Sequence, residues 1–220
     1  MDSIKSIESP YLKEAIAEKK WAFASDFVRI YATYNYGGIY LDTDVMVHKS
    51  FDDLINNVFF IGKESSFHIH GNGHDTLNYL SAHCFGCEAR HPFLKDCLDY
   101  FNSIHFIRSN EASLPNELKY DMTILPYIQA VFAQRYGYNW LTSATDTQYL
   151  DMNMTVYSSE YFDSKKHEQK SYCTHLALGS WREYERYNPK ITFRYKIAWR
   201  IKALTEKILN KFSYTMIKLT

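Results

Sequence analysis

The chain has 220 residues and a mass of 26.0 kDa, and 46% of its residues are hydrophobic. This is enough apolar material for one sizeable core, so we expect one globular domain. The 25 basic residues balance 25 acidic ones, which leaves no overall positive field to hold a nucleic-acid backbone. The apolar stretches are too short to cross a bilayer, and the first residues lack the apolar segment of a signal peptide. We therefore expect a cytoplasmic protein that does not bind nucleic acid.

Helical and extended patterns alternate along the chain, as is typical of an α/β domain. Ser9 and Pro10 form an N-cap followed by a proline at the first helical position, which predicts a helix over 10–20. A second helix over 21–36 ends at two glycines, and the chain then continues as a strand over 39–47. The remaining expected elements are strands at 57–64, 82–89, 154–157 and 171–176, helices at 91–102 and 121–136, and a polar loop at 65–80.

Cysteine usage argues against a metal or disulfide scaffold. Cys84 and Cys87 form a C-x-x-C pair, but Cys97 and Cys173 are isolated. A zinc knuckle needs a second clustered pair, and a disulfide scaffold of this length needs more than four cysteines. We expect buried thiols, with zinc or redox chemistry as the less favoured alternative.

The C-terminal residues are strongly basic. From Arg182 onward ten basic residues stand against three acidic ones, and apolar residues recur at helical spacing between 197 and 212. The pattern predicts a basic amphipathic helix within a tail at 182–220, after a catalytic domain at 1–181. This helix either docks on the domain or contacts an anionic membrane surface through 190–218. The second alternative would place the protein peripherally on the inner membrane face.

Two acidic positions follow the second helix. In an extended segment Tyr40, Asp42 and Asp44 share one face. Their carboxylates repel each other unless a cation neutralises them, and hard carboxylate oxygens suit Mg²⁺ or Mn²⁺. Within the preceding helix Asp26 and Arg29 are three residues apart and project together. Taken alone, D-x-D is typical of a solvated turn, and the Asp26–Arg29 pair is typical of an exposed ion pair.

The combination of motifs is more specific. Ala24-Ser25-Asp26, Arg29 and the run YGGIYLDTD, which ends at Asp44, resemble the signature of glycosyltransferase family 32, whose sugar-binding region contains a DXD motif. That family is distantly similar to the clostridial glucosylating toxins. Downstream, SYCTH at 171–175 and GSW at 179–181 resemble the family's C-terminal His and Ser-Trp motifs. The resemblance covers most of residues 9–181.

The resemblance implies a fold and a reaction. The fold is α/β and GT-A-like, with a mixed sheet flanked by helices. The reaction is the retaining transfer of a hexose from a nucleotide-diphosphate sugar, with UDP the expected nucleotide. The acceptor is a surface or capsular polysaccharide or a lipid-linked oligosaccharide. A homo-oligomer is compatible with this interpretation.

The resemblance also implies a metal site. Asp42 and Asp44 are the catalytic pair: Asp44 binds Mn²⁺ or Mg²⁺ directly, and Asp42 contacts the ribose or reaches the metal through water. His175 supplies a further metal or pyrophosphate contact. A cation held there would neutralise the diphosphate as the glycosidic bond breaks.

The remaining implied residues bind the donor. Ser180 and Trp181 hold the β-phosphate together with the metal site. Asp26 and Arg29 bind the donor sugar hydroxyls, and Tyr40 lines the same pocket.

Family members usually begin with a strand that precedes the equivalent of Ser9, and this sequence contains none. We therefore expect a catalytic domain that is N-terminally truncated relative to the family, with an exposed sheet edge beside 39–47. One alternative is an impaired remnant or interaction module that keeps the same scaffold. A second alternative is a D-x-D phosphatase, which Met46 at the fifth motif position disfavours.

Overall fold

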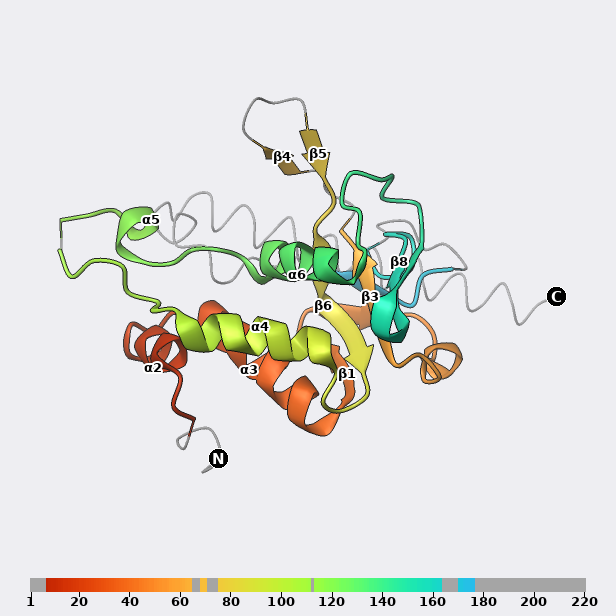
Figure 1. Cartoon of the computed structure of the whole chain (residues 1–220), viewed down its shortest axis with the longest axis horizontal. Coiled ribbons are helices and arrows are strands. Elements are labelled where there is room, and N and C mark those ends of the chain that lie inside the picture. Colours follow the sequence, from red (N-terminus) through yellow and green to blue (C-terminus); the bar gives the residue numbers. More distant parts are fainter. Residues whose placement is uncertain (1–6, 65–67, 71–74, 112, 164–169, 177–220) are drawn as a thin grey trace, which may run out of the picture. The chain divides into compact units, whose positions relative to one another are not determined.

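A computed structural model describes most of the chain, with the exception of its two ends and four short internal stretches (Figure 1). The described residues are 7–64, 68–70, 75–111, 113–163 and 170–176. Ser180, Trp181 and the predicted basic helix lie outside these ranges. All structural statements below concern the described residues.

The first two described helices both begin at their predicted residues, and the second also ends at its predicted residue. Helix α2 (Pro10–Ala17) starts after Ser9, whose hydroxyl accepts a hydrogen bond from the backbone N–H of Leu12 at 3.4 Å. Helix α3 (Trp21–Tyr36) ends at Gly37, which has a φ of +68°. A Cβ at this position would lie 2.8 Å from the backbone nitrogen of Ala89, so a larger residue would be both strained and crowded. Helix α2 stops three residues before its predicted end.

A five-stranded mixed sheet forms the centre of the domain. Its order is β1-β6-β3-β8-β7. Strands β3 and β8 are parallel, and the other pairs are antiparallel. Among the described strands of this sheet, β1 lies at one edge. The bounds are Gly38–Leu41 for β1, Leu80–Cys87 for β6, Phe59–Lys63 for β3, Met154–Tyr157 for β8 and Gln148–Leu150 for β7.

Most of the apolar residues lie between this sheet and the helices. Helices α4 (Pro92–Ser103) and α6 (Leu125–Ala133) join α2 and α3 in one large core, with α4 lying between α3 and α6 (Figure 1). A smaller core contains Phe60, Cys84 and residues from the last described segment of the chain. The architecture is α/β with a mixed sheet flanked by helices, as predicted, and it is consistent with a GT-A-like fold.

The predicted single strand over 39–47 is wrong. The chain leaves β1 after Leu41, turns at 42–44 and enters β2 (Val45–Val47), which pairs with β9 (Cys173–His175) in a separate two-stranded sheet. A hydrogen bond from the N–H of Val45 to the carbonyl of Asp42 at 3.1 Å closes the turn. The acidic residues therefore lie in a turn between two sheets and do not share one face of an extended strand.

Other parts of the prediction need smaller corrections. The expected loop at 65–80 contains the hairpin strands β4 (His68–His70) and β5 (Asp75–Leu77). The helix expected over 121–136 begins only at Leu125, because the N–H of Asp121 bonds the carbonyl of Phe106 at 2.7 Å and keeps the preceding residues extended. A 3-10 turn (Gln134–Tyr136) continues that helix to its predicted end. The other unpredicted elements among the described residues are strand β7, helix α5 (Asn116–Lys119) and the 3-10 turns Asp52–Leu54 and Asp151–Asn153.

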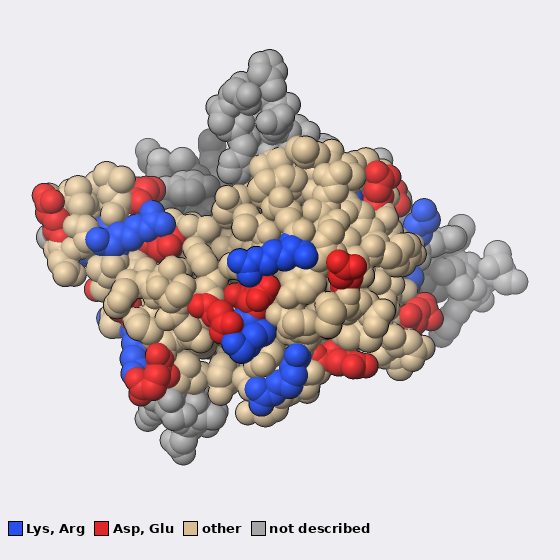
Figure 2. Space-filling model, viewed as in Figure 1, with Lys and Arg blue, Asp and Glu red and all other residues tan. Residues whose placement is uncertain are grey.

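The side chains of the described surface are mixed in charge. Figure 2 shows basic side chains beside acidic ones on the face it presents, and ion pairs such as Lys95–Asp99 at 2.6 Å lie on the helices. All four cysteines are buried free thiols, as predicted. Among the helices described, none has the length and apolar character needed to span a bilayer.

Candidate metal and donor site

The turn after β1 brings three predicted metal ligands together. Strand β9 pairs with β2 so that His175 lies opposite Val45, directly after Asp44. The His175 Nε2 is 3.3 Å from a carboxylate oxygen of Asp44 and 4.0 Å from one of Asp42. One ligand atom from each residue lies within 4.8 Å of the others. Residues that are more than 130 positions apart in the sequence thus form one cluster.

The donor set suits a divalent cation. Two ligand atoms that share one ion at about 2.1 Å can be at most about 4.2 Å apart, and the separations of His175 from both carboxylates meet that limit. Burial lowers the pKa of His175, as does the neighbouring His83, while Asp44 and Asp42 oppose the shift. The imidazole is therefore neutral at pH 7, which is the form that binds metals. Carboxylates with one imidazole suit Mn²⁺, Mg²⁺ or another divalent ion.

Arg29 joins the helix to the turn. Its side chain is buried, and it contacts Asp26 at 3.2 Å and Asp42 at 3.0 Å. It also donates to the carbonyl of Ala82, to the carbonyl of Ser25 and to the Ser25 hydroxyl. Three of these contacts are hydrogen bonds, and the two with carboxylates are ion pairs. The pair predicted from its i,i+3 spacing is therefore a buried network and not the exposed ion pair that such spacing usually gives.

Asp26 is strongly affected by its burial. Its side chain is 15% exposed, and desolvation raises its pKa to about 6. Arg29 and the backbone N–H of Leu125, at the start of α6, favour the charged form, while the negative charge of Asp42 disfavours it. Asp26 therefore carries less negative charge below pH 6 than an ordinary aspartate does.

Tyr40 lies beside the same network. The guanidinium of Arg29 is 4.7 Å from the centre of its ring, and its hydroxyl donates to Asp42 at 2.5 Å. Burial is the main reason why its pKa is raised. The side chains of Tyr40 and Arg29 together hold one oxygen of Asp42, which leaves the other oxygen on the side of His175.

The sequence analysis missed His83. This residue lies in the middle of β6 and is 4% exposed. Its ring stacks on that of His175, with 4.5 Å between centroids and 16° between planes. Its carbonyl accepts a hydrogen bond from the N–H of Asp42 at 2.9 Å. A histidine inside an apolar strand was the available signal, but such a residue is more often an ordinary core histidine.

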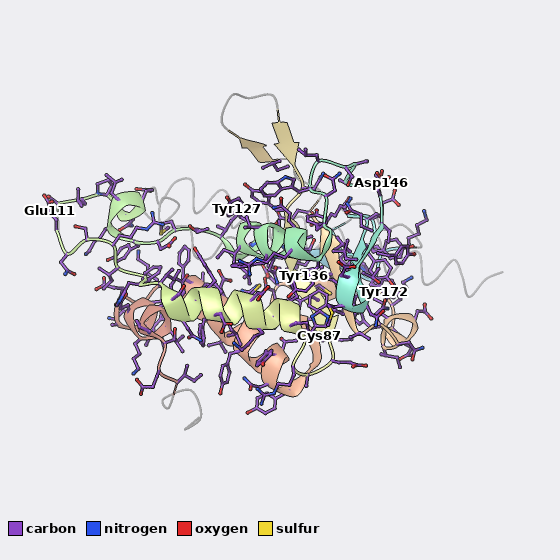
Figure 3. The ribbon with its side chains drawn as sticks, in the orientation of Figure 1. Cys87, Glu111, Tyr127, Tyr136, Asp146 and Tyr172 are labelled. Atoms are coloured by element: carbon purple, nitrogen blue, oxygen red, sulfur yellow. The ribbon has the colours of Figure 1, made fainter. Side chains whose placement is uncertain are left out.

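Strand β9 is fixed by aromatic contacts just before it begins. Tyr172, labelled in Figure 3, stacks on Phe51 at 5.6 Å and on Phe162 at 5.8 Å. Its carbonyl accepts from the N–H of His48 at 2.8 Å. These contacts secure the segment that carries His175. The predicted phosphate-binding residues Ser180 and Trp181 lie beyond it and outside the described ranges.

Comparison with known proteins supports the interpretation of the first part of the chain. No curated protein and no solved structure matches the chain. Residues 1–60, which include Asp26, Arg29 and the DXD turn, match the family model described as "Glycosyltransferase sugar-binding region containing DXD motif". The match supports the assignment of residues 1–60 to a glycosyltransferase region of the DXD type.

Proposed function

We propose that this chain is a metal-dependent hexosyltransferase that uses a nucleotide-diphosphate sugar, with UDP as the expected nucleotide. The observation that carries the proposal is the convergence of Asp42, Asp44 and His175 within 4.8 Å, next to the buried Arg29 network. Retention of the anomeric configuration and a surface polysaccharide or lipid-linked acceptor follow from the resemblance to glycosyltransferase family 32.

The three clustered residues would hold Mn²⁺ or Mg²⁺. Such an ion neutralises the charge that develops on a leaving diphosphate. Asp44 and His175, which are 3.3 Å apart, would bind it directly, and the oxygen of Asp42 that faces His175 would bind it directly or through water. Ser180 and Trp181 would contact the β-phosphate from the segment that follows His175.

Asp26 and Arg29 would contact the donor sugar. Asp26 in its charged form accepts hydrogen bonds from sugar hydroxyls, and Arg29 fixes its orientation. Arg29 already makes three hydrogen bonds and two ion pairs, so a bond from it to a sugar hydroxyl would compete with these contacts. The contact with the Ser25 carbonyl, at 3.4 Å, is the longest and the easiest to exchange. Tyr40 would line the pocket through its place beside Arg29.

Thermal unfolding with Mn²⁺ and UDP tests the proposal. We expect the two together to raise the Tm of the wild type and to leave that of Asp42→Asn/Asp44→Asn unchanged, because ligands stabilise the state that binds them. The control is Asp96→Asn/Asp99→Asn, which removes two carboxylates of α4 outside the site and should keep the wild-type shift. An equal shift in Asp42→Asn/Asp44→Asn would show that the metal binds elsewhere.

Hydrolysis assays then separate the alternatives. A transferase should release hexose slowly from a UDP-sugar in the presence of Mn²⁺. A phosphatase would hydrolyse p-nitrophenyl phosphate instead, and a remnant that keeps only the scaffold would do neither. A screen of UDP-sugars would also identify the donor.

The basic tail gives a separate proposal about location. We propose that the protein is cytoplasmic and that residues 190–218, which lie outside the described ranges, bring it to an anionic membrane surface. Binding to vesicles with anionic lipid should then exceed binding to neutral vesicles and should weaken as salt is added. Equal binding to both kinds of vesicle would leave the docked helix as the explanation of the tail's pattern.

A further inference from the structure

His83 contacts the candidate metal site in two ways. The face of its ring lies against the ring of His175, at 4.5 Å and nearly parallel. Its backbone carbonyl holds the N–H of Asp42 at 2.9 Å. One residue of the central sheet therefore touches two of the three candidate ligands, which themselves come from the turn and from β9.

The ring of His83 is itself fixed. Its Nε2 is 2.9 Å from the carbonyl oxygen of Phe162, and because a carbonyl can only accept, this nitrogen carries a hydrogen and donates it. The thiol of Cys173 donates to the same Phe162 carbonyl at 3.6 Å. Since β6 lies inside the five-stranded sheet, His83 is a rigid surface for the ring of His175.

A ligand ring needs such a surface. An imidazole on a short strand can rotate about its side-chain bonds, and each rotation moves Nε2 away from the carboxylates. Groups outside the ligand shell that hold a ligand in one orientation commonly raise metal affinity by about 10–100-fold. An offset or stacked partner ring restricts this rotation without taking a ring nitrogen away from the metal.

We propose that His83 is a positioning residue that orients His175 toward Asp42 and Asp44 through ring stacking. The inference rests on the metal site of the proposed function. It assigns two separable roles to one side chain: the ring face orients His175, and Nε2 satisfies the buried carbonyl of Phe162.

Two substitutions separate these roles. His83→Phe keeps an aromatic face but leaves the Phe162 carbonyl without its N–H donor, so it should lower the Tm and keep Mn²⁺ affinity within about threefold of wild type. His83→Gln keeps an N–H donor but loses the ring, so it should weaken Mn²⁺ binding by about tenfold or more. Mn²⁺ affinity is measured on the full chain from the paramagnetic resonance signal of free Mn²⁺, without donor and at fixed pH.

His91→Gln is the matched control. His91 is also 4% exposed, its Nε2 also contacts a carbonyl, that of Met152 at 3.1 Å, and its ring lies 4.9 Å from that of Phe59. It caps α4, and its contacts within the described part of the chain do not include the three ligands. We expect His91→Gln to lower the Tm without changing Mn²⁺ affinity.

The outcomes distinguish this inference from the metal site on which it rests. If His175→Ala abolishes Mn²⁺ binding while His83→Gln binds like wild type, the metal site stands and the positioning role is wrong. Weaker binding by His83→Phe than by His83→Gln would also overturn the role of the ring face. If wild type binds no Mn²⁺, or if His175→Ala binds it normally, both the proposed metal site and the role of His83 fall. If His83→Phe does not fold, the comparison of His83→Gln with His91→Gln decides.

Discussion

The large core and the small core of this domain are built from different kinds of contact. In the large core, four helices pack apolar and aromatic side chains such as Phe93 and Phe101 against the central sheet. In the small core, Phe60 and Cys84 of the sheet meet Phe162, Tyr172 and Cys173 from the last described part of the chain. Of the candidate ligands, His175 lies on β9, the strand that this segment delivers, and Asp42 and Asp44 lie in the turn before β2.

The two cores are therefore expected to contribute differently to the stability of the domain and to the geometry of the candidate site. The large core buries most of the apolar residues and is expected to carry most of the stability. The small core buries less, but it joins positions that are far apart in the sequence, as in the stacking of Phe51 on Tyr172 at 5.6 Å. The candidate site forms only when these long-range contacts bring His175 on β9 next to the turn that carries Asp42 and Asp44.

The largest expected effect is a loss of stability in the large core. Phe101 is fully buried, and its ring lies 4.8 Å from that of Tyr11 and 6.0 Å from that of Phe27. Phe101→Ala should lower the free energy of unfolding by about 3–5 kcal/mol, because it leaves a cavity among the helices. Urea unfolding measures this loss. Mn²⁺ affinity of the folded protein should stay at the wild-type value, and a parallel loss of affinity would show that the two cores are not separable.

The second expected effect is a pH dependence of the free energy of unfolding that comes from the ionisation of Asp26. Its pKa is about 6 in the folded protein, above the ordinary 3.8, chiefly because of burial. The groups that face it are Arg29 on its own helix, Asp42 on the turn, the N–H of Leu125 on α6 and Tyr11 on α2. The folded state therefore binds the proton more tightly than the unfolded state, and stability is lost as pH rises from about 4 to 6.

The variant Asp26→Asn tests whether stability falls as pH rises because of Asp26. Relative to wild type, the free energy of unfolding of the variant should rise by up to about 3 kcal/mol between pH 4 and pH 7. This value corresponds to a difference of about two units between the folded and unfolded pKa of Asp26. Urea unfolding of both proteins across this range measures the difference, in which the titrations of other groups cancel. A constant difference between the two proteins would mean that Asp26 is charged throughout and fully compensated by Arg29.

Local signals account for the parts of the fold that the sequence predicts well. Ser9 and Gly37 mark helix ends through their own side chain or backbone, and the spacing of Asp26 and Arg29 places them on one helix face. The alternation of Tyr40, Asp42 and Asp44 is compatible both with one strand and with two strands joined by a turn. Only the pairing of β2 with β9, a long-range contact, decides between these two structures.

Local sequence patterns likewise predict only part of the candidate site. Asp42 and Asp44 are close in sequence, so their proximity is predictable, whereas His175 entered through a resemblance and not through spacing. The sequence around His83 shows only a histidine inside an apolar strand, because its role depends on the position of a ring that belongs to a segment more than 90 residues away. Residues that position others across sheets are therefore the part of a site that local patterns do not reveal.

A third prediction compares the two cores through ligand binding. Mn²⁺ at about 100 times its Kd should raise the free energy of unfolding by about 2.7 kcal/mol in wild type, because it binds only the folded state. The increment should be the same in Phe101→Ala, since a distant packing defect adds to it independently. It should vanish in His175→Ala. A smaller increment in Phe101→Ala would show that the large core also sets the geometry of the site.

The smallest effect is expected where the small core meets the sheet. Gly86 on β6 lies directly opposite Phe60 on β3, and a Cβ at this position would lie 2.6 Å from the Cζ of the Phe60 ring and 3.1 Å from Ile39. The Phe60 ring cannot move away freely, because it stacks on Phe162 at 5.8 Å. Gly86→Ala should therefore cost about 1–3 kcal/mol through overpacking, although alanine suits a strand better than glycine does.

A double-mutant cycle tests this cause. Phe60→Leu should make room for the added methyl group, so Gly86→Ala should cost less in that background than in wild type. Because Phe162 and Tyr172 of the same cluster support β9, Gly86→Ala alone should also weaken Mn²⁺ binding, and Phe60→Leu should restore part of it. Equal costs in the two backgrounds would place the strain at Ile39 on β1 instead. In that case the small core would be looser than its stacked rings indicate, and β9 would depend on its pairing with β2 to hold His175.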